Sequence, residues 1–159
     1  MKVFTIGTDH RTHFDFTRVL LKYGVQVVFD IRRVPESRED YFRRDGLQAL
    51  TATQGIDYVY LGNELGGPRD GDYRQWVEGD EYKRGLDILI RKAPKRVCCL
   101  LCAERTPENC HRLAIARELA RQGIEIVHIL DETSVWTPPP PSASTSTSTY
   151  RARPQRPRR

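Results

Sequence analysis

The stretch that decides the fold is VCCLLCAERTPENCHRLAIARELARQGIEIVHIL, residues 97–130. Its first six residues form a short apolar run, and a second such run spans Ile124 to Leu130. Between the two runs, apolar and small residues recur at helical spacing from Leu113 to Ala120, and this pattern ends at Gly123. A strand, a helix and a strand in this order predict two parallel strands joined by a crossover helix.

The rest of the chain repeats this alternation. Three further short apolar runs lie at residues 3–6, 26–31 and 58–61. Helical patterns separate them at residues 14–23 and 47–53, and another runs through Leu86, Leu89 and Ile90 and stops before Pro94. Most of the strands lack strict alternation, which is typical of strands covered on both faces. We therefore expect a three-layer α/β domain with a mainly parallel sheet of about five strands and helices on both faces.

Glycines lie where predicted helices end and where a long loop is expected. Gly24, Gly55 and Gly123 each stand one to three positions before a strand and indicate helix ends. The interval from Gly62 to Asp80 is rich in glycine and shows no clear period. Such an interval predicts a long loop, which in a compact domain is usually functional or mobile.

Charge divides the chain into two parts. All 21 acidic residues precede Ser134, whereas five of the 26 basic residues are arginines between positions 151 and 159. The residues from Ser134 onward are rich in Pro, Ser and Thr. We predict one α/β domain over residues 1–133 and a disordered, arginine-rich tail over residues 134–159. Because the domain itself is neutral, any contact with nucleic acid or a partner is expected from the tail.

The sequence also indicates where the protein resides. No window approaches the roughly 18 apolar residues of a membrane span, and Met1 leads directly into a strand pattern instead of a charged leader. The four cysteines lie within thirteen positions, which does not resemble a disulfide framework. We expect a cytoplasmic protein with reduced cysteines and no membrane partner.

Three cysteines lie in the apolar run from Val97 to Cys102. Side chains alternate between the two faces of a strand, so Cys98 and Cys102 are predicted to share one face and Cys99 to occupy the other. The C-x-x-C spacing of Cys99 and Cys102 therefore does not predict a metal site. Cys98 and Cys99 are expected to be core residues, whereas Cys102 lies at the strand end, where ligands bind in parallel sheets.

The sequence after this strand supplies the other reactive groups. Thr106 or Asn109 is predicted to cap a helix, and either choice leaves Cys110, His111 and Arg112 in its first turns. A thiol near the unpaired N–H groups of a helix start should have a pKa below its usual value. Cys110 is therefore the cysteine that we expect to be reactive.

Several roles fit these residues. In a nucleophilic site, Cys110 or Cys102 attacks, His111 or Glu104 moves protons, and Arg112 holds an anion. In a metal site, Cys102, Cys110 and His111 ligate a divalent ion, with Glu104 as a possible fourth ligand.

A purely structural role is also consistent with the sequence. Both cysteines are then buried, and His111 and Arg112 pair with Glu104 or Glu108.

Further candidates for anion binding follow the other strands. Asp30 and Arg32 bracket one apolar residue at a strand end, so they can form an ion pair or face a ligand together. The remaining candidates are Gly7, His10, Gly66 and Gly67.

Four motifs of this chain resemble a bacterial and archaeal family of unknown function, the domain family numbered 488. The motifs are Thr5-Ile6-Gly7, Asp30-Ile31-Arg32 with Pro35, Ser37 and Arg38, Glu64-Leu65-Gly66-Gly67, and Cys102-Ala103-Glu104 with Pro107, Glu108 and Cys110-His111-Arg112. The resemblance covers about Met1 to Leu130, and it implies an α/β fold whose motifs meet in one pocket. Members usually carry a histidine and a serine directly after the first glycine. This chain has Thr8-Asp9-His10 there, so His10 is the candidate substitute.

Two functions are consistent with these patterns. The first is an enzyme that acts on a phosphorylated, nucleotide or nucleic-acid substrate through the Cys102, Glu104, Cys110, His111 and Arg112 group. The second is a non-catalytic module that binds a small molecule or a metal ion, with the arginine tail contacting nucleic acid or a partner.

Overall fold

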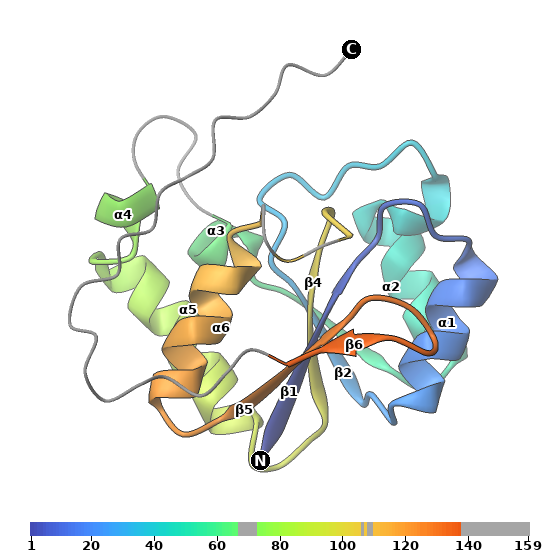
Figure 1. Ribbon diagram of the computed structural model, residues 1–159. Coiled ribbons are helices and arrows are strands. Elements are labelled where there is room, and N and C mark those ends of the chain that lie inside the picture. The colour runs from blue at the N-terminus through green and yellow to red at the C-terminus, as the bar shows by residue number, and fades with distance from the viewer. Residues whose placement is uncertain (67–72, 106, 108–109, 138–159) are drawn as a thin grey trace.

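The computed structural model describes residues 1–66, 73–105, 107 and 110–137 (Figure 1). It confirms a three-layer α/β domain. The strands are β1 (Lys2–Gly7), β2 (Val27–Asp30), β3 (Asp57–Tyr60), β4 (Cys98–Cys102), β5 (Glu125–Ile129) and β6 (Val135–Trp136). The helices are α1 (His13–Lys22), the 3-10 turn η1 (Asp40–Phe42), α2 (Arg44–Thr53), α3 (Gly62–Leu65), α4 (Tyr73–Trp76), α5 (Asp80–Lys92) and α6 (Arg112–Arg121). None of the described helices has the length and apolar content needed to cross a bilayer.

The six strands form one sheet in the order β3-β2-β4-β1-β5-β6. The first five strands in the chain are parallel, as predicted, and β6 runs antiparallel to β5. Strand β6 was not predicted, because its two residues lie where the proline-rich tail was expected to begin. The sheet thus extends to Trp136, beyond the predicted domain end at residue 133. Residues 138–159 of the predicted tail lie outside the described residues.

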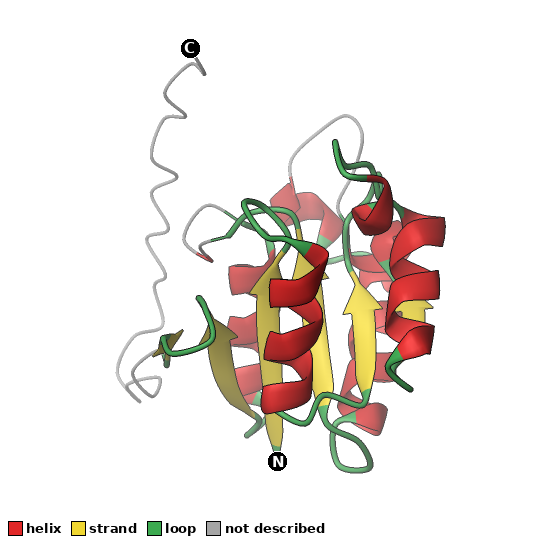
Figure 2. Cartoon of the chain, turned by 90° about the vertical axis from the view of Figure 1, so that its right-hand side faces the viewer, coloured by secondary structure: helices red, strands yellow, loops and turns green. Residues whose placement is uncertain are grey.

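Helices cover both faces of the sheet (Figures 1 and 2). Helices α1 and α2 pack on one face through residues such as Phe16 and Leu47, and α3, α5 and α6 pack on the other. Alternation along β4 assigns its cysteines as predicted: Cys98 and Cys102 belong to the α5/α6 face and Cys99 to the α1/α2 face. The face that carries Cys102 is therefore the one on which α6 begins.

Local signals explain where one helix begins and where three helices end. The hydroxyl of Thr12 caps α1 by accepting a hydrogen bond from the Asp15 amide at 3.1 Å. The three glycines predicted to end helices all have positive φ angles, between 67° and 83°. The interval from Gly62 to Asp80 was predicted as an irregular loop, but it contains α3 and α4. Four residues are too few to show a helical period, which explains the error.

The carboxyl ends of the central strands meet closely. Beyond β1, the amides of Thr8 and Asp9 donate to the carbonyls of Cys102 and Ala103, at 3.0 and 2.9 Å. This continues the pairing of β1 with β4 past the strand ends. A Cβ atom on Gly7 would lie 1.8 Å from the Glu104 carbonyl oxygen, so only glycine permits this approach.

At the other side of β1, His128 on β5 is fully buried. Its Nδ1 atom lies 2.6 Å from the Thr5 hydroxyl, and its ring stacks on Trp136 of β6 at an interplanar angle of 24°. The Nε2 atom has no hydrogen-bond partner among the described residues. Burial, with a smaller contribution from the charge of Arg112, lowers the pKa of His128 to about 4.

Replacing Gly7 should destabilise the fold. We expect Gly7→Ala to lower the free energy of unfolding by about 3 kcal/mol, because the methyl group must displace the Glu104 backbone. Gly79→Ala is the control, since φ at Gly79 is −80° and the nearest atom to an added Cβ lies 3.3 Å away. Urea denaturation of both variants measures the difference. Equal losses in the two variants would show that the close approach does not matter.

His128 should make stability depend on pH. The neutral ring is the buried form, so its contribution is complete above pH 6.5 and is lost as the pH falls toward 4. Lowering of the His128 pKa from 6.5 to about 4 corresponds to a change of about 3 kcal/mol in the free energy of unfolding over that pH range. We expect His128→Asn to remove this part of the pH dependence in urea denaturation at pH 7.5 and pH 5. Parallel pH profiles for the variant and the unmodified protein would contradict the assignment.

Candidate metal centre

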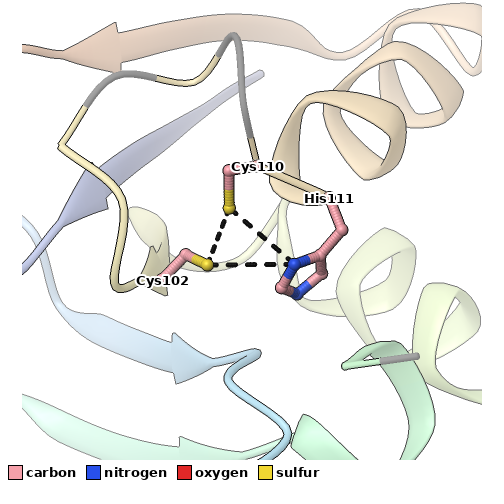
Figure 3. A group of neighbouring side chains, drawn as sticks. All are labelled: Cys102, Cys110 and His111. Atoms are coloured by element: carbon pink, nitrogen blue, oxygen red, sulfur yellow. Dashed lines mark hydrogen bonds between the residues drawn. The ribbon is translucent and has the colours of Figure 1, made fainter. Parts of the chain in front are cut away.

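Three potential ligand atoms converge at the carboxyl end of β4 (Figure 3). The Cys102 and Cys110 sulfurs lie 2.7 Å apart, and His111 Nδ1 lies 3.9 Å from the first sulfur and 3.8 Å from the second. Both cysteines are buried and unbridged. These three residues were the candidate metal ligands predicted from the sequence, and they lie together in the structure.

The βα unit that contains these residues explains why they meet. Strand β4 ends at Cys102, whose side chain faces the layer of α5 and α6. Farther along the chain, Cys110 and His111 directly precede Arg112, the first residue of α6. His111 is the N-cap residue of this helix. Cys102 and Cys110, which are eight positions apart in the sequence, thus face each other.

The α-helix begins later than predicted, although Pro107 lies in a 3-10 turn and its carbonyl accepts a hydrogen bond from the Cys110 amide at 3.2 Å. Neither Cys110 nor His111 lies inside the first turn, because α6 begins at Arg112. The two residues predicted as caps, Thr106 and Asn109, lie outside the described residues.

His111 is oriented by the sheet. Its Nε2 atom lies 3.0 Å from the carbonyl oxygen of Ile31, just beyond β2. A carbonyl only accepts hydrogen bonds, so Nε2 carries a proton, and Nδ1 is the nitrogen that faces the two sulfurs. The Tyr73 ring of α4 packs edge-on against His111, with ring centroids 5.8 Å apart. A hydrogen bond to the non-ligating nitrogen is the usual way in which proteins orient a histidine that binds metal.

The acidity of the two cysteines is the reverse of that predicted. Cys110 donates its S–H to the Cys102 sulfur, which lowers the pKa of Cys102 well below its ordinary value despite burial. The same contact, together with burial, raises the pKa of Cys110. The contact between the sulfurs thus favours a thiolate on Cys102 and a thiol on Cys110. The expected lowering of the Cys110 pKa is wrong, because Cys110 precedes the helix and donates its S–H to Cys102, whereas which cysteine is reactive stays a prediction.

Cys102 also changes the pKa of His111. Burial alone lowers the pKa of the ring, but the hydrogen bond and charge of Cys102 outweigh it, so the pKa of His111 is raised. The thiolate form of Cys102 and a proton on the His111 ring therefore favour each other in the metal-free chain. A metal ion bound between the ligand atoms would replace the protons, as metal binding to thiol and imidazole ligands generally does.

Two residues predicted to act beside the cysteines have other contacts. Arg112 is fully buried, and its Nη1 and Nη2 groups donate to the carbonyls of Glu104 and Arg105. Its Nε group is buried without a hydrogen-bond partner among the described residues. Glu104 is not part of the convergent group of potential ligands found among the described residues. Arg112 nevertheless contributes positive charge at both cysteines, and this charge favours their thiolate forms.

The second predicted site is a buried ion pair. Arg32 Nε and Nη2 donate to the two carboxylate oxygens of Asp30, at 2.9 and 2.8 Å. The Tyr58 hydroxyl donates to the same carboxylate at 2.5 Å, and Arg32 Nη1 donates to the Phe42 carbonyl at 2.6 Å. Of the two arrangements that the sequence left open, the structure shows the ion pair.

The remaining candidates occupy turns around the same edge. Gly7 packs against the Glu104 backbone, and Gly66 packs against Arg33, whose Cβ atom would lie 2.6 Å from an added Cβ atom. The exposed residue His10 has a φ of 59°, and its carbonyl accepts a hydrogen bond from Arg105 at 3.1 Å. Gly67 lies outside the described residues.

Sequence reasoning missed two neighbours of the cluster. The Ile31 carbonyl is a backbone group, which any residue type would supply, so no sequence signal marks it. Tyr73 lies in the interval that showed no period and was predicted as loop.

The ligand set fits a zinc ion. Two thiolates and one imidazole suit Zn²⁺, which sits about 2.3 Å from sulfur and about 2.0–2.1 Å from nitrogen. Tetrahedral coordination with these bond lengths separates sulfur from nitrogen by about 3.6 Å and the two sulfurs by about 3.8 Å. His111 therefore already lies near its required position, and the sulfurs would have to move apart by about 1 Å.

Comparison with known proteins identifies a family. No curated protein matches the chain. A family model described as domain of unknown function DUF488 matches residues 14–119, which is more than half of the 159 residues. The matched region contains β2, β3 and β4, the three candidate ligands and most of α6. The chain is therefore a member of the DUF488 family.

Proposed function

We propose that Cys102, Cys110 and His111 bind a divalent metal ion, best Zn²⁺, as the centre of an enzyme that acts on a small anionic substrate. The observation that carries this proposal is the position of His111. Its Nε2 atom is tied to the Ile31 carbonyl while Nδ1 is directed at both sulfurs. This is the arrangement expected for a histidine ligand with an outer hydrogen bond that orients it.

The number of ligands supports catalysis over a structural role. Structural zinc sites are almost always closed by four protein ligands, whereas catalytic sites use three and leave one position open. Among the described residues, three ligand atoms converge. When bound, the metal ion supplies Lewis-acid chemistry at that open position.

Charge supports an anionic substrate. Two thiolates balance the charge of a divalent ion, so the centre itself is neutral. Arg112 adds a buried positive charge close enough to favour the thiolate forms of both cysteines. A carboxylate or phosphate at the open position would balance the charge of Arg112.

A second candidate function is covalent catalysis by the Cys102 thiolate. It is favoured by the lowered pKa of Cys102 beside His111. It is less well supported than the metal centre, because the Nη groups of Arg112, the predicted anion holder, are bonded to carbonyls. Rapid alkylation of Cys102 that zinc does not slow would favour it.

The non-catalytic alternative uses the same three ligands, without turnover. The predicted contact of the arginine tail with nucleic acid or a partner concerns residues outside the described ones.

Metal content tests the proposed centre. We expect the purified protein to bind one Zn²⁺ per chain, measured by elemental analysis and by competition with a chromogenic chelator. Cys110→Ser and His111→Ala each remove a ligand, so affinity should fall by more than the roughly 10- to 100-fold that loss of an outer-shell partner costs. Cys98→Ser is the matched control, because Cys98 lies on the same strand and face but outside the cluster. Absence of zinc, or equal affinity in all variants, would contradict the proposal.

The open position can be tested separately with cobalt. Co²⁺ accepts the same ligands and reports its coordination through its visible absorption spectrum. We expect inorganic phosphate to change the spectrum of the Co²⁺-loaded protein in a saturable manner and to inhibit alkylation of Cys102. Glycerol, a neutral molecule of similar size, serves as the control. A spectrum that phosphate leaves unchanged would argue for a closed, non-catalytic centre.

A further inference from the structure

We propose that Cys102 and Cys110 also form a reversible redox pair, so that the metal-free chain carries out thiol–disulfide exchange with small disulfides. This inference deepens the proposed function, because it concerns two ligands of the same centre. It does not need the metal, however, and it can hold even if the chain binds none.

The geometry brings the two sulfurs together and no other pair. They lie 2.7 Å apart as free thiols, whereas a disulfide bond is about 2.05 Å long. The Cys102 sulfur comes from the end of β4, and the Cys110 sulfur comes from the residue two positions before α6, whose carbonyl accepts a hydrogen bond from the Leu113 amide at 3.0 Å. A bond between them would close only the short connection between this strand and this helix.

The other two cysteines are not equivalent. Cys98 and Cys99 point to opposite faces of the sheet, and their sulfurs contact the carbonyls of Arg96 and Leu100. Burial raises the pKa of Cys98 to about 11, which keeps it a thiol at neutral pH. Exchange should therefore be confined to Cys102 and Cys110.

Hydrogen bonding sets the order of the steps. Because Cys110 donates its S–H to Cys102, the Cys102 sulfur carries the free lone pairs and attacks the substrate R–S–S–R. A Cys102–S–S–R bond forms, the R–S bond to the second sulfur breaks, and the released thiolate takes a proton from solvent. Cys110 then loses its proton to solvent, which frees its sulfur for the second attack.

The second attack completes the exchange. The Cys110 sulfur attacks Cys102, forms the intramolecular disulfide and releases the second R–S⁻, which is protonated in turn. Two cysteine thiols are oxidised, and one small disulfide is reduced to two thiols. The pair is regenerated by any dithiol that reverses the reaction.

Burial of the two cysteines favours small disulfides as substrates, and their oxidation affects metal binding. Both cysteines are only 5% exposed, which disfavours attack on a protein disulfide, whereas a small disulfide such as oxidised glutathione has far less to displace. Once oxidised, neither sulfur is a thiolate, and thiolates are the ligands that zinc requires. Oxidation would thus abolish metal binding, and bound zinc would protect the pair from oxidation.

The experiment is oxidation of the metal-free full-length chain with oxidised glutathione, followed by thiol titration and peptide mapping. We expect the chain to keep two of its four thiols, to lose the mass of two hydrogens, and to yield one peptide pair linked through Cys102 and Cys110. Dithiothreitol should restore all four thiols. Cys98→Ala should behave like the unmodified protein, and Cys110→Ala should stop at a stable glutathione adduct on Cys102.

Other results would overturn the inference. These are four unreacted thiols, a lasting glutathione adduct in the unmodified protein, or a linked pair that includes Cys98 or Cys99. Mapping of the unmodified protein decides the matter even if Cys110→Ala fails to fold. Zinc content, measured separately on the reduced protein, distinguishes the two proposals. Disulfide formation without zinc binding would leave the redox pair standing and remove the metal centre, and zinc binding without disulfide formation would do the reverse.

Discussion

Strand β4 is hydrogen-bonded along both of its edges, to β1 and to β2, and the site depends on this double pairing. The pairing fixes where β4 ends relative to its neighbouring strands and the face of the sheet to which Cys102 points. Because β2 is in register with β4, the Ile31 carbonyl is placed where His111 can reach it. The start of α6 is thereby attached to the end of β2 as well as to β4, the strand that precedes it in the chain. This attachment brings the two sulfurs into contact.

Buried charges hold the loops around this edge. Arg112 donates to the backbone after β4, Arg11 to the carbonyls of Gly7 and Leu130, and Arg32 to the Phe42 carbonyl. Carbonyls at strand ends lose their partners in the sheet, and a buried guanidinium satisfies several of them at once. These arginines thus have a structural role, but the charge of Arg112 also favours the thiolate forms of the cysteines. The same side chain both shapes the site and tunes it.

The sequence was sufficient to predict the five parallel strands along the chain, because three of them follow a glycine that ends a helix. It also predicted the faces of the β4 cysteines, since alternation in a strand depends on geometry alone. It did not predict β6, α3 or α4, because elements of two to four residues are too short to show a period. The acidity of the two cysteines was predicted in reverse, because it depends on which sulfur holds the shared proton, and that is set by a contact between residues eight positions apart.

The site itself was predicted in part. Cys102, Cys110 and His111 were named from their types and their position at a strand end, and they converge. The partner that orients His111 is a backbone carbonyl, which carries no sequence signal. Asp30 and Arg32 satisfy one another because both lie in the interior, and burial of a charged pair is not visible in the sequence.

In the proposed centre, two sulfurs and one nitrogen from this chain surround a metal ion that keeps one position open. X-ray absorption at the zinc edge of the reduced, zinc-loaded protein measures this coordination directly. A centre built from Cys102, Cys110 and His111 predicts two sulfur atoms at about 2.3 Å, and one imidazole nitrogen and one further light atom at about 2.0–2.2 Å. A shell of nitrogen and oxygen alone, or one of four sulfurs, would contradict it.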